Sequence, residues 1–325
     1  MNTSTSLMGR AMLRRDFLGC LAAAASLALE SSGRALAYTK QRRHHGASPP
    51  PTLDRIAIST WSLHNYFRAT RESSFNLPGP ALVLLDFPDV IVDRYRVRHF
   101  EFCASHFPST DPAYLKELKY ALVHTQSTVV NLAVDIDQCG PDGAFSDPDR
   151  EARLAAREAV RAWVDVAHSL GVKCISVPPG KFDPENLARS AESYKTLATY
   201  ALAKGVHVIV ENQYGFGDER PEELANLIKL VGTGRIGALP SLANFPDEPT
   251  RAKGLKMLFP LAPTVCHANL TELNADGVKP AFDFSQAIEI AKQSGFRGIY
   301  TIEFDGSGDP YAGIQKTMDE LLKDL

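Results

Sequence analysis

Short apolar runs alternate with amphipathic segments along most of the chain. From Thr52 onward, a β-branched or apolar run ends in a polar residue, a loop follows, and an amphipathic segment comes next. Apolar runs of this length are typical of parallel strands that are buried on both faces. The predicted strands are the eight runs 56–58, 99–102, 129–132, 174–177, 208–210, 236–239, 265–266 and 299–302.

The segments between these runs have the spacing and the end signals of helices. One apolar stripe at helical spacing is formed by Val160, Trp163, Ala167 and Leu170. Asp-Pro pairs predict helix starts, because Asp caps the first N–H groups and Pro fits the first turn; they are 111–112, 147–148, 183–184 and 309–310. Glycine shortly before a strand predicts a helix end, at Gly171, Gly205 and Gly295.

Eight strand–helix alternations over residues 52–325 predict an α/β protein, a single (β/α)8 barrel. A doubly wound sheet is the other architecture that such an alternation allows. That fold usually carries a glycine-rich G-x-G-x-x-G turn after an early strand. The sequence contains no such turn, so the barrel is favoured.

The first 37 residues have the features of an export signal. Arg14-Arg15-Asp16-Phe17-Leu18 precedes the apolar run 20–29, and Ala35-Leu36-Ala37 supplies small residues for cleavage. This pattern predicts a twin-arginine (Tat-type) signal peptide over residues 1–37. Residues 38–51, which end in three prolines, read as a flexible linker. We therefore expect a periplasmic or secreted protein.

Composition and charge narrow the class of partner. The formal net charge is −3, and removal of a signal with four arginines and two acidic residues shifts it to −5. Nucleic-acid binding is not expected from such a chain. No apolar stretch reaches the ~18 residues of a membrane helix, so the mature form should have no stable span. Four cysteines of the mature chain lie far apart in the sequence, and we expect them to be buried thiols. Their disulfide state is left open; they are Cys103, Cys139, Cys174 and Cys266.

Polar residues at the ends of the predicted strands are the candidate chemistry, because barrel active sites form at the carboxyl ends of the strands. Glu211, His267 and Glu303 each follow an apolar run. A charge there is costly unless it is paired or bound to metal. Two carboxylates and one imidazole at one mouth predict a divalent-metal site. A hydrogen-bond network without a metal is the alternative for each residue.

Five further polar or aromatic residues near strand ends are candidates for substrate binding. A tryptophan can stack on a sugar ring, and acidic, imidazole or amide groups can bind hydroxyls. A purely structural role is an equal alternative for several of them. The five residues are Trp61, Glu101, His106, Asn212 and Asn269.

Several short motifs together resemble the sugar phosphate isomerase/epimerase family, within the xylose isomerase-like barrel superfamily. The resemblance extends over residues 52–325 and rests on the order and spacing of segments 92–101, 208–212, 238–246, 265–268, 302–304 and 305–311. It implies a divalent metal (Mn²⁺, Mg²⁺, Co²⁺ or Zn²⁺) held by Glu, Asp, His and Glu on strands 5 to 8. No arginine stands near Ser176, where family members often have one, which argues against a phosphate-bearing substrate.

Three positions match the family's four ligands, and one departs. Glu211, His267 and Glu303 match, whereas Ser241 stands where the family usually has Asp, with Asn244 nearby. Ser241 and Asn244 are thus the remaining candidate ligands. A neutral oxygen binds a cation more weakly than a carboxylate, so we expect weaker or altered metal binding.

The resemblance implies an exported sugar isomerase or epimerase. Glu211 and Glu303 would be the catalytic pair that transfers a proton next to a carbonyl through an enediolate. A lyase that acts on oxidised (keto) glycosides by the same chemistry, and a sugar-binding barrel without catalysis, stay open. A DNA-repair endonuclease on this barrel is disfavoured by the acidic charge. The expected partner is a small sugar or sugar derivative, and a homo-oligomer is left open.

Overall fold

The computed structural model of the chain describes residues 51–139, 144–180, 187–213, 216–217, 219–270, 282–306 and 308–325. These described residues form one compact unit. The predicted signal peptide, the linker up to residue 50 and the helix start at 183–184 lie outside the described residues.

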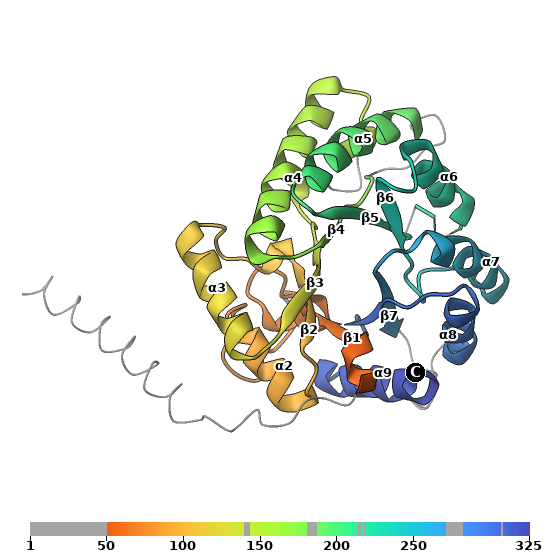
Figure 1. Ribbon diagram of the computed structural model, residues 1–325. Helices are drawn as coiled ribbons and strands as arrows, with labels where there is room; N and C mark the ends of the chain where they lie inside the picture. The colour runs from red at the N-terminus through yellow and green to blue at the C-terminus, as the bar shows by residue number, and fades with distance from the viewer. Residues whose placement is uncertain are drawn as a thin grey trace, which may run out of the picture. The chain divides into compact units, whose positions relative to one another are not determined.

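Eight parallel strands form one sheet in the order β6-β5-β4-β3-β2-β1-β8-β7. A single parallel β-bridge pairs Ser241, just after β6, with His267 on β7. This bridge joins the two edges of the sheet and closes the barrel (Figure 1). The predicted (β/α)8 barrel is confirmed. The strands are β1 (Ile56–Ser59), β2 (His99–Cys103), β3 (Thr128–Ala133), β4 (Cys174–Ser176), β5 (His207–Glu211), β6 (Ile236–Leu239), β7 (Val265–Leu270) and β8 (Ile299–Phe304).

The α-helices lie outside the strands and cover the barrel wall (Figure 1). They are α2 (Phe87–Tyr95), α3 (Pro112–His124), α4 (Arg150–Leu170), α5 (Leu187–Ala203), α6 (Pro221–Val231), α7 (Glu248–Leu258), α8 (Phe284–Gln293) and α9 (Pro310–Asp324). Short 3₁₀ segments include η2 (Thr60–Tyr66), which follows β1, and η3 (Ala104–His106), which follows β2.

The predicted helix ends can be compared with the capping that the structure shows. Helix α9 begins at Pro310, and Asp309 accepts a hydrogen bond from the Tyr311 N–H at 3.0 Å, as expected. Helix α4 begins at Arg150 rather than at the predicted Asp-Pro pair, because Asp149 accepts the cap bond from Glu151 N–H at 3.0 Å. Gly171 ends α4 at a φ of 79°, which favours glycine.

The interior of the barrel has an apolar layer and a polar layer. Cys174, Ile209, Leu239 and Val265 form a buried cluster, with Val130 and Ile299 packed against it. Side chains two positions apart on a strand point to the same face. Ile209 and Val265 are therefore followed inward by Glu211 and His267. The apolar layer forms a floor beneath the polar layer at the carboxyl ends of the strands.

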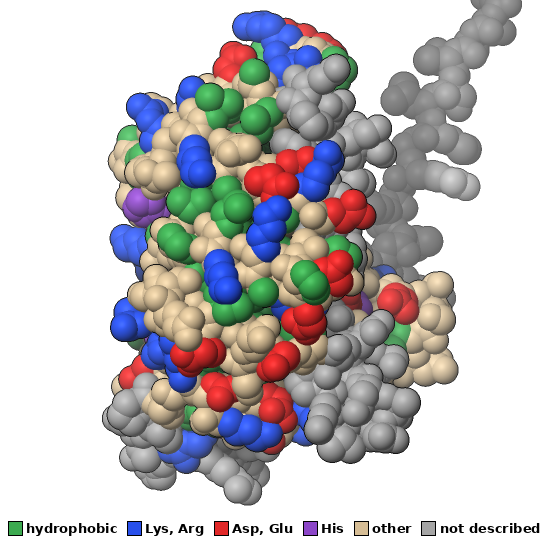
Figure 2. Space-filling model, turned by 90° about the vertical axis from the view of Figure 1, so that its right-hand side faces the viewer, with side chains coloured by type: hydrophobic (Ala, Val, Ile, Leu, Met, Phe, Trp, Pro, Cys, Tyr) green, Lys and Arg blue, Asp and Glu red, His purple; other side chains and the backbone are tan. Residues whose placement is uncertain are grey.

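Several expectations from composition can be read directly from the described residues. The cysteines Cys103, Cys139, Cys174 and Cys266 are buried and unbridged, as expected. No helix in the described part of the chain is long and apolar enough to cross a membrane. On the face in Figure 2, basic and acidic side chains are intermixed rather than gathered by sign.

Candidate active site and metal centre

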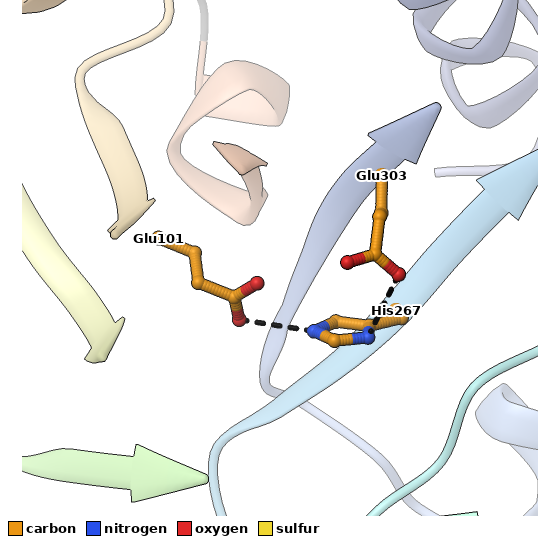
Figure 3. Close-up of side chains that lie close together, drawn as sticks. All are labelled: Glu101, His267 and Glu303. Atoms are coloured by element: carbon orange, nitrogen blue, oxygen red, sulfur yellow. Dashed lines mark hydrogen bonds and ion pairs between the residues drawn. The ribbon is translucent and has the colours of Figure 1, made fainter. Parts of the chain in front are cut away.

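His267 lies at the centre of a cluster of carboxylates inside the mouth of the barrel. Its Nδ1 atom is 2.9 Å from Glu211 Oε1 and 3.3 Å from Glu303 Oε2. Its Nε2 atom is 3.0 Å from Glu101 Oε2. Figure 3 shows Glu101 and Glu303 at opposite ends of the imidazole ring. Strands β2, β5, β7 and β8 thus bring together four residues that are far apart in the sequence.

Burial differs between the two ends of this ring. The side chain of His267 is 2% exposed and that of Glu101 is 0% exposed, whereas those of Glu211 and Glu303 are each 19% exposed. A molecule from solvent therefore reaches the Nδ1 end of the imidazole, where Glu211 and Glu303 lie. The Nε2 end faces the closed interior.

A short chain of hydrogen bonds fixes Glu101 from behind. Asn131 Nδ2 donates to Glu101 Oε2 at 2.8 Å and to Ser176 Oγ at 2.9 Å. The pairing of β2 with β3 shifts register between Phe100 and Glu101, so that Glu101 comes opposite Asn131. Irregularities of this kind re-aim a side chain near functional sites. The shift therefore gives the buried carboxylate a fixed neighbour.

The electrostatic environment separates the pKa values of the carboxyl groups. Burial raises the pKa of Glu303, and the nearby carboxylates of Glu211 and Glu101 add to this, against the opposing effect of His267. For Glu101, burial opposes ionisation, but His267 and Asn131 outweigh it and lower its pKa. Burial alone would lower the pKa of His267, yet the three carboxylates hold it well above its usual range. Carboxyl groups with separated pKa values are typical of acid–base sites.

Ser241 lies beside His267 at the seam where the barrel closes. His267 N–H donates to Pro240 O at 2.8 Å, and Leu242 N–H donates to His267 O at 3.0 Å. The hydroxyl oxygen of Ser241 is buried and has no hydrogen-bond partner among the described residues. Ser241 therefore offers one unengaged oxygen next to the carboxylate cluster.

The asparagines of this region hold the loop after β6. Asn212 accepts from Ser241 N–H at 2.8 Å and donates to the carbonyls of Ser241 and Asn244. Asn269 accepts from Ala243 N–H at 2.9 Å and donates to Asn244 Oδ1 at 3.1 Å. Asn244 in turn donates to Glu211 Oε1 at 3.3 Å. The candidate ligand Asn244 thus orients Glu211, and the polar atoms of Asn212 and Asn269 are engaged by this loop.

The two remaining candidates lie together beside β8. Trp61 is half-buried and stacks on His64 and His106, with ring centroids 5.0 and 6.3 Å apart. His106 is 4% exposed and stacks on Phe67 at 4.0 Å. The segment η2, which carries Trp61, is tied to β8 through Ser62, whose hydroxyl accepts from Phe304 N–H at 2.9 Å, directly after Glu303.

Both ring nitrogens of His106 are engaged by hydroxyl groups. The Nδ1 and Nε2 atoms each lie 2.9 Å from a threonine Oγ1, of Thr60 and Thr70 respectively. Thr70 donates its own proton to His64 O at 2.7 Å, so it accepts from His106 Nε2–H. Burial, and to a smaller extent His64, lowers the pKa of His106 to about 3. His106 is therefore neutral in the folded protein.

The neutral state of His106 predicts a pH dependence of stability. Its pKa is lower in the folded chain than in the unfolded one, so its contribution is complete above about pH 6.5 and is lost as the pH falls. Between pH 7.5 and 5 we expect a loss of about 2 kcal/mol in unfolding free energy from this group. Urea unfolding of His106→Gln should lack this part of the slope, whereas the exposed His168→Gln should keep it. Equal slopes in both variants would contradict the assignment.

One member of the cluster, Asn131, was not among the residues singled out from the sequence. The sequence does contain a signal for it, because Asn131 is the one polar residue within the apolar run 129–132. Glu101 was singled out as a residue that contacts hydroxyls, and the structure places it against His267. The partner of Glu101 depends on strand register, which the sequence pattern alone does not give.

The donor set fits a divalent cation. Potential ligand atoms of Glu101, His267 and Glu303 all lie within 4.8 Å of one another, and Glu211 Oε1 lies 2.9 Å from His267 Nδ1. Ligands about 2.0–2.2 Å from one ion lie roughly 3–3.5 Å apart, close to the 2.9 and 3.3 Å contacts of His267 Nδ1. The unpartnered hydroxyl of Ser241 is a further oxygen next to this position. Carboxylate and imidazole ligands suit Mg²⁺, Mn²⁺, Co²⁺ or Zn²⁺.

The fold and the site define a (β/α)8 barrel with a candidate divalent-metal site at the carboxyl ends of its strands. A family model described as "Xylose isomerase-like TIM barrel" matches residues 95–325, and the chain belongs to this family. This match confirms the superfamily to which the sequence motifs pointed. A search of curated proteins finds no match.

Solved structures with the same fold include sugar epimerases. A D-allulose 3-epimerase from Methylomonas sp. is 15% identical, with a TM-score of 0.63 over 83% of this chain and 98% of that chain. The 3-keto-D-glucoside 4-epimerase from E. coli is 15% identical, with a TM-score of 0.59 over 83% and 99%. A xylose isomerase-like barrel protein from Mycobacterium smegmatis, in complex with magnesium, is 15% identical, with a TM-score of 0.62 over 83% and 97%.

Proposed function

We propose that this chain is a divalent-metal-dependent isomerase or epimerase of a keto sugar. The observation that carries this proposal is that Glu211 and Glu303 both contact Nδ1 of His267, at 2.9 and 3.3 Å, on the side of the ring that solvent reaches. A pair of carboxylates around one open position is what proton transfer at a carbon next to a carbonyl requires. The epimerases of the same fold support this reading.

The two glutamates have different environments, which supports different roles. A divalent ion bound between them and His267 would polarise the substrate carbonyl and stabilise the developing enediolate charge. In the protein without an ion, burial raises the pKa of Glu303, which favours it as the group that holds a proton. In this proposal Glu303 takes the proton from the carbon next to the carbonyl. Glu211, which Asn244 holds at 3.3 Å, enters the cycle protonated and delivers its proton to the carbon that receives one, and exchange with solvent returns both residues to their starting states.

The site in this proposal serves an uncharged sugar outside the cytoplasm. Arg14 and Arg15 with the small residues 35–37 support export by a Tat-type signal to the periplasm or beyond. Trp61 is half-buried beside β8, where its ring is available to a sugar face. Both features belong to the proposal, as does the homo-oligomer that the sequence leaves open.

Exchange of a carbon-bound proton with solvent tests the proposal directly. The full-length protein is incubated in D₂O with D-allulose, D-fructose or a 3-keto-D-glucoside, with Mn²⁺ or with a chelator. We expect NMR to show deuterium at the carbon next to the carbonyl, together with an isomer or epimer, only when the ion is present. Exchange that is equally fast in chelator would remove the metal from the proposal.

The same experiment separates the alternatives. Release of the aglycone from a 3-keto-glucoside, without an epimer, would identify a lyase. Sugar binding without exchange or turnover, in a preparation that has bound the ion, would identify a sugar-binding barrel. Either result would replace the proposed function.

Replacement of Ser241 by Asp tests the metal part of the proposal. Ser241 is 0% exposed and adjoins His267, so an aspartate there would add a carboxylate to the proposed ligand set. We expect Ser241→Asp to bind Mn²⁺ at least about tenfold more tightly, or ~1.4 kcal/mol. In chelator the variant should melt below the unaltered protein, because a further buried charge is then unpaired. Calorimetric titration and thermal melts measure the two effects.

Ser190 provides a matched control for this substitution. Its side chain is also 0% exposed, and its hydroxyl also lacks a partner among the described residues, but it lies on α5. Ser190→Asp should be destabilised equally with Mn²⁺ and with chelator. If Ser241→Asp behaves in the same way, Ser241 does not adjoin a metal site.

A further inference from the structure

We infer that Glu101 is a positioning residue: it accepts a hydrogen bond from Nε2 of His267 and thereby presents Nδ1 to the metal, without being a ligand itself. This inference rests on the proposed metal site. It concerns a residue on β2, whereas the resemblance places the metal ligands on strands 5 to 8 only.

The direction of the imidazole carries the first step. A histidine binds a metal through one nitrogen, and its other N–H commonly donates to a carboxylate that fixes the tautomer and the ring orientation. Here Nδ1 faces the two partly exposed carboxylates, of Glu211 and Glu303, and Nε2 faces Glu101 at 3.0 Å. The opposed positions of Glu101 and Glu303 around the ring are visible in Figure 3.

The second step is that Glu101 Oε2 already has two hydrogen-bond partners. Oε2 already accepts from Asn131 Nδ2 at 2.8 Å and lies 3.0 Å from His267 Nε2. An ion at Oε2 would have to displace both contacts; Oε1 has no hydrogen-bond partner among the described residues, but it belongs to a side chain that is 0% exposed, so an ion from solvent does not reach it. On the Nδ1 side an ion would replace the contacts of His267 Nδ1 with Glu211 and Glu303, but these two side chains are each 19% exposed, so an ion can reach their oxygens from solvent. The ligand role therefore falls to Glu211 and Glu303.

Charge carries the third step. Ser241 leaves the β6 side of the site without a carboxylate, yet His267 still contacts three carboxylates because Glu101 contributes one from β2. A carboxylate behind the ring increases the electron density that the imidazole offers to an ion. Glu101 thus compensates part of what the serine removes, from the opposite side of His267.

Cobalt binding tests this inference, because Co²⁺ reports both affinity and coordination. The unaltered protein, Glu101→Gln, Glu303→Gln and the exposed control Glu289→Gln are titrated with Co²⁺ and followed by visible absorption and calorimetry. We expect Glu101→Gln to bind about 10–100-fold more weakly with an unchanged spectrum. Glu303→Gln should change the spectrum, because a ligand is lost, and Glu289→Gln should match the unaltered protein.

The outcomes that overturn the inference differ from those that overturn the proposed function. A spectrum that changes in Glu101→Gln as it does in Glu303→Gln would make Glu101 a direct ligand. An affinity within twofold of the unaltered protein would make its role structural only. Each of these results leaves the metal site in place. Failure of the unaltered protein to bind Co²⁺ would instead remove the metal from the proposed function, and this inference with it.

Discussion

Glu303→Gln is expected to lower the rate of proton exchange by about 10²–10⁴-fold while leaving the fold intact. The amide has the shape of the carboxyl group but cannot take a proton from carbon. Burial already raises the pKa of Glu303, so a neutral side chain is tolerated at this position. The measurement is the rate of deuterium incorporation into whichever keto sugar the unaltered protein turns over, together with a thermal melt.

Glu320 provides the matched control for Glu303. Its side chain on α9 is 18% exposed, against 19% for Glu303, and it pairs with Lys323 at 2.7 Å, away from the cluster around His267. Glu320→Gln should exchange protons at the normal rate. Retained exchange in Glu303→Gln would end its role as the base and leave Glu211 as the remaining candidate.

The architecture was predictable from the sequence because its signals are local. Each strand of a parallel barrel is a short apolar run, and each run is read without knowledge of its neighbours. Helix ends are less certain, because adjacent residues compete for the cap. Asp149, and not the preceding Asp-Pro pair, caps α4, since its side chain reaches Glu151 N–H.

The sequence could predict a residue of the site only where that residue stands at the end of its own strand. Glu211, His267 and Glu303 follow apolar runs, and the structure brings all three together. The partnership of Glu101 with His267 depends on barrel closure, and that with Asn131 depends on a register shift. Neither barrel closure nor a register shift can be read from local sequence. The sequence therefore identified Glu101 as a polar residue at the mouth of the barrel, but it did not identify the partners of Glu101.

His267→Gln is expected to lower the unfolding free energy by about 3–5 kcal/mol at pH 7 in chelator, because it leaves buried carboxylates without their cationic partner. The imidazole lies 2.9–3.3 Å from three carboxylates, and Glu101 is 0% exposed. The low pKa of Glu101 depends on His267, so its pKa should rise in the variant. A carboxyl group whose pKa is raised in the folded state stabilises the fold at low pH and loses this contribution as the pH rises.

The free energy that Glu101 contributes to His267→Gln should therefore be larger at pH 5 than at pH 7.5, which urea unfolding of His267→Gln and of the double variant Glu101→Gln/His267→Gln at the two values measures. His168→Gln is the control, because His168 is exposed and its Nδ1 atom hydrogen-bonds the Lys204 carbonyl at 2.8 Å, away from the carboxylate cluster. Its unfolding free energy should stay within about 0.5 kcal/mol of the unaltered protein at both pH values. A difference between His267→Gln and the double variant that is the same at both pH values would mean that the pKa of Glu101 does not depend on His267. Glu101 would then keep its charge without the imidazole, and the electrostatic basis of the site would fail.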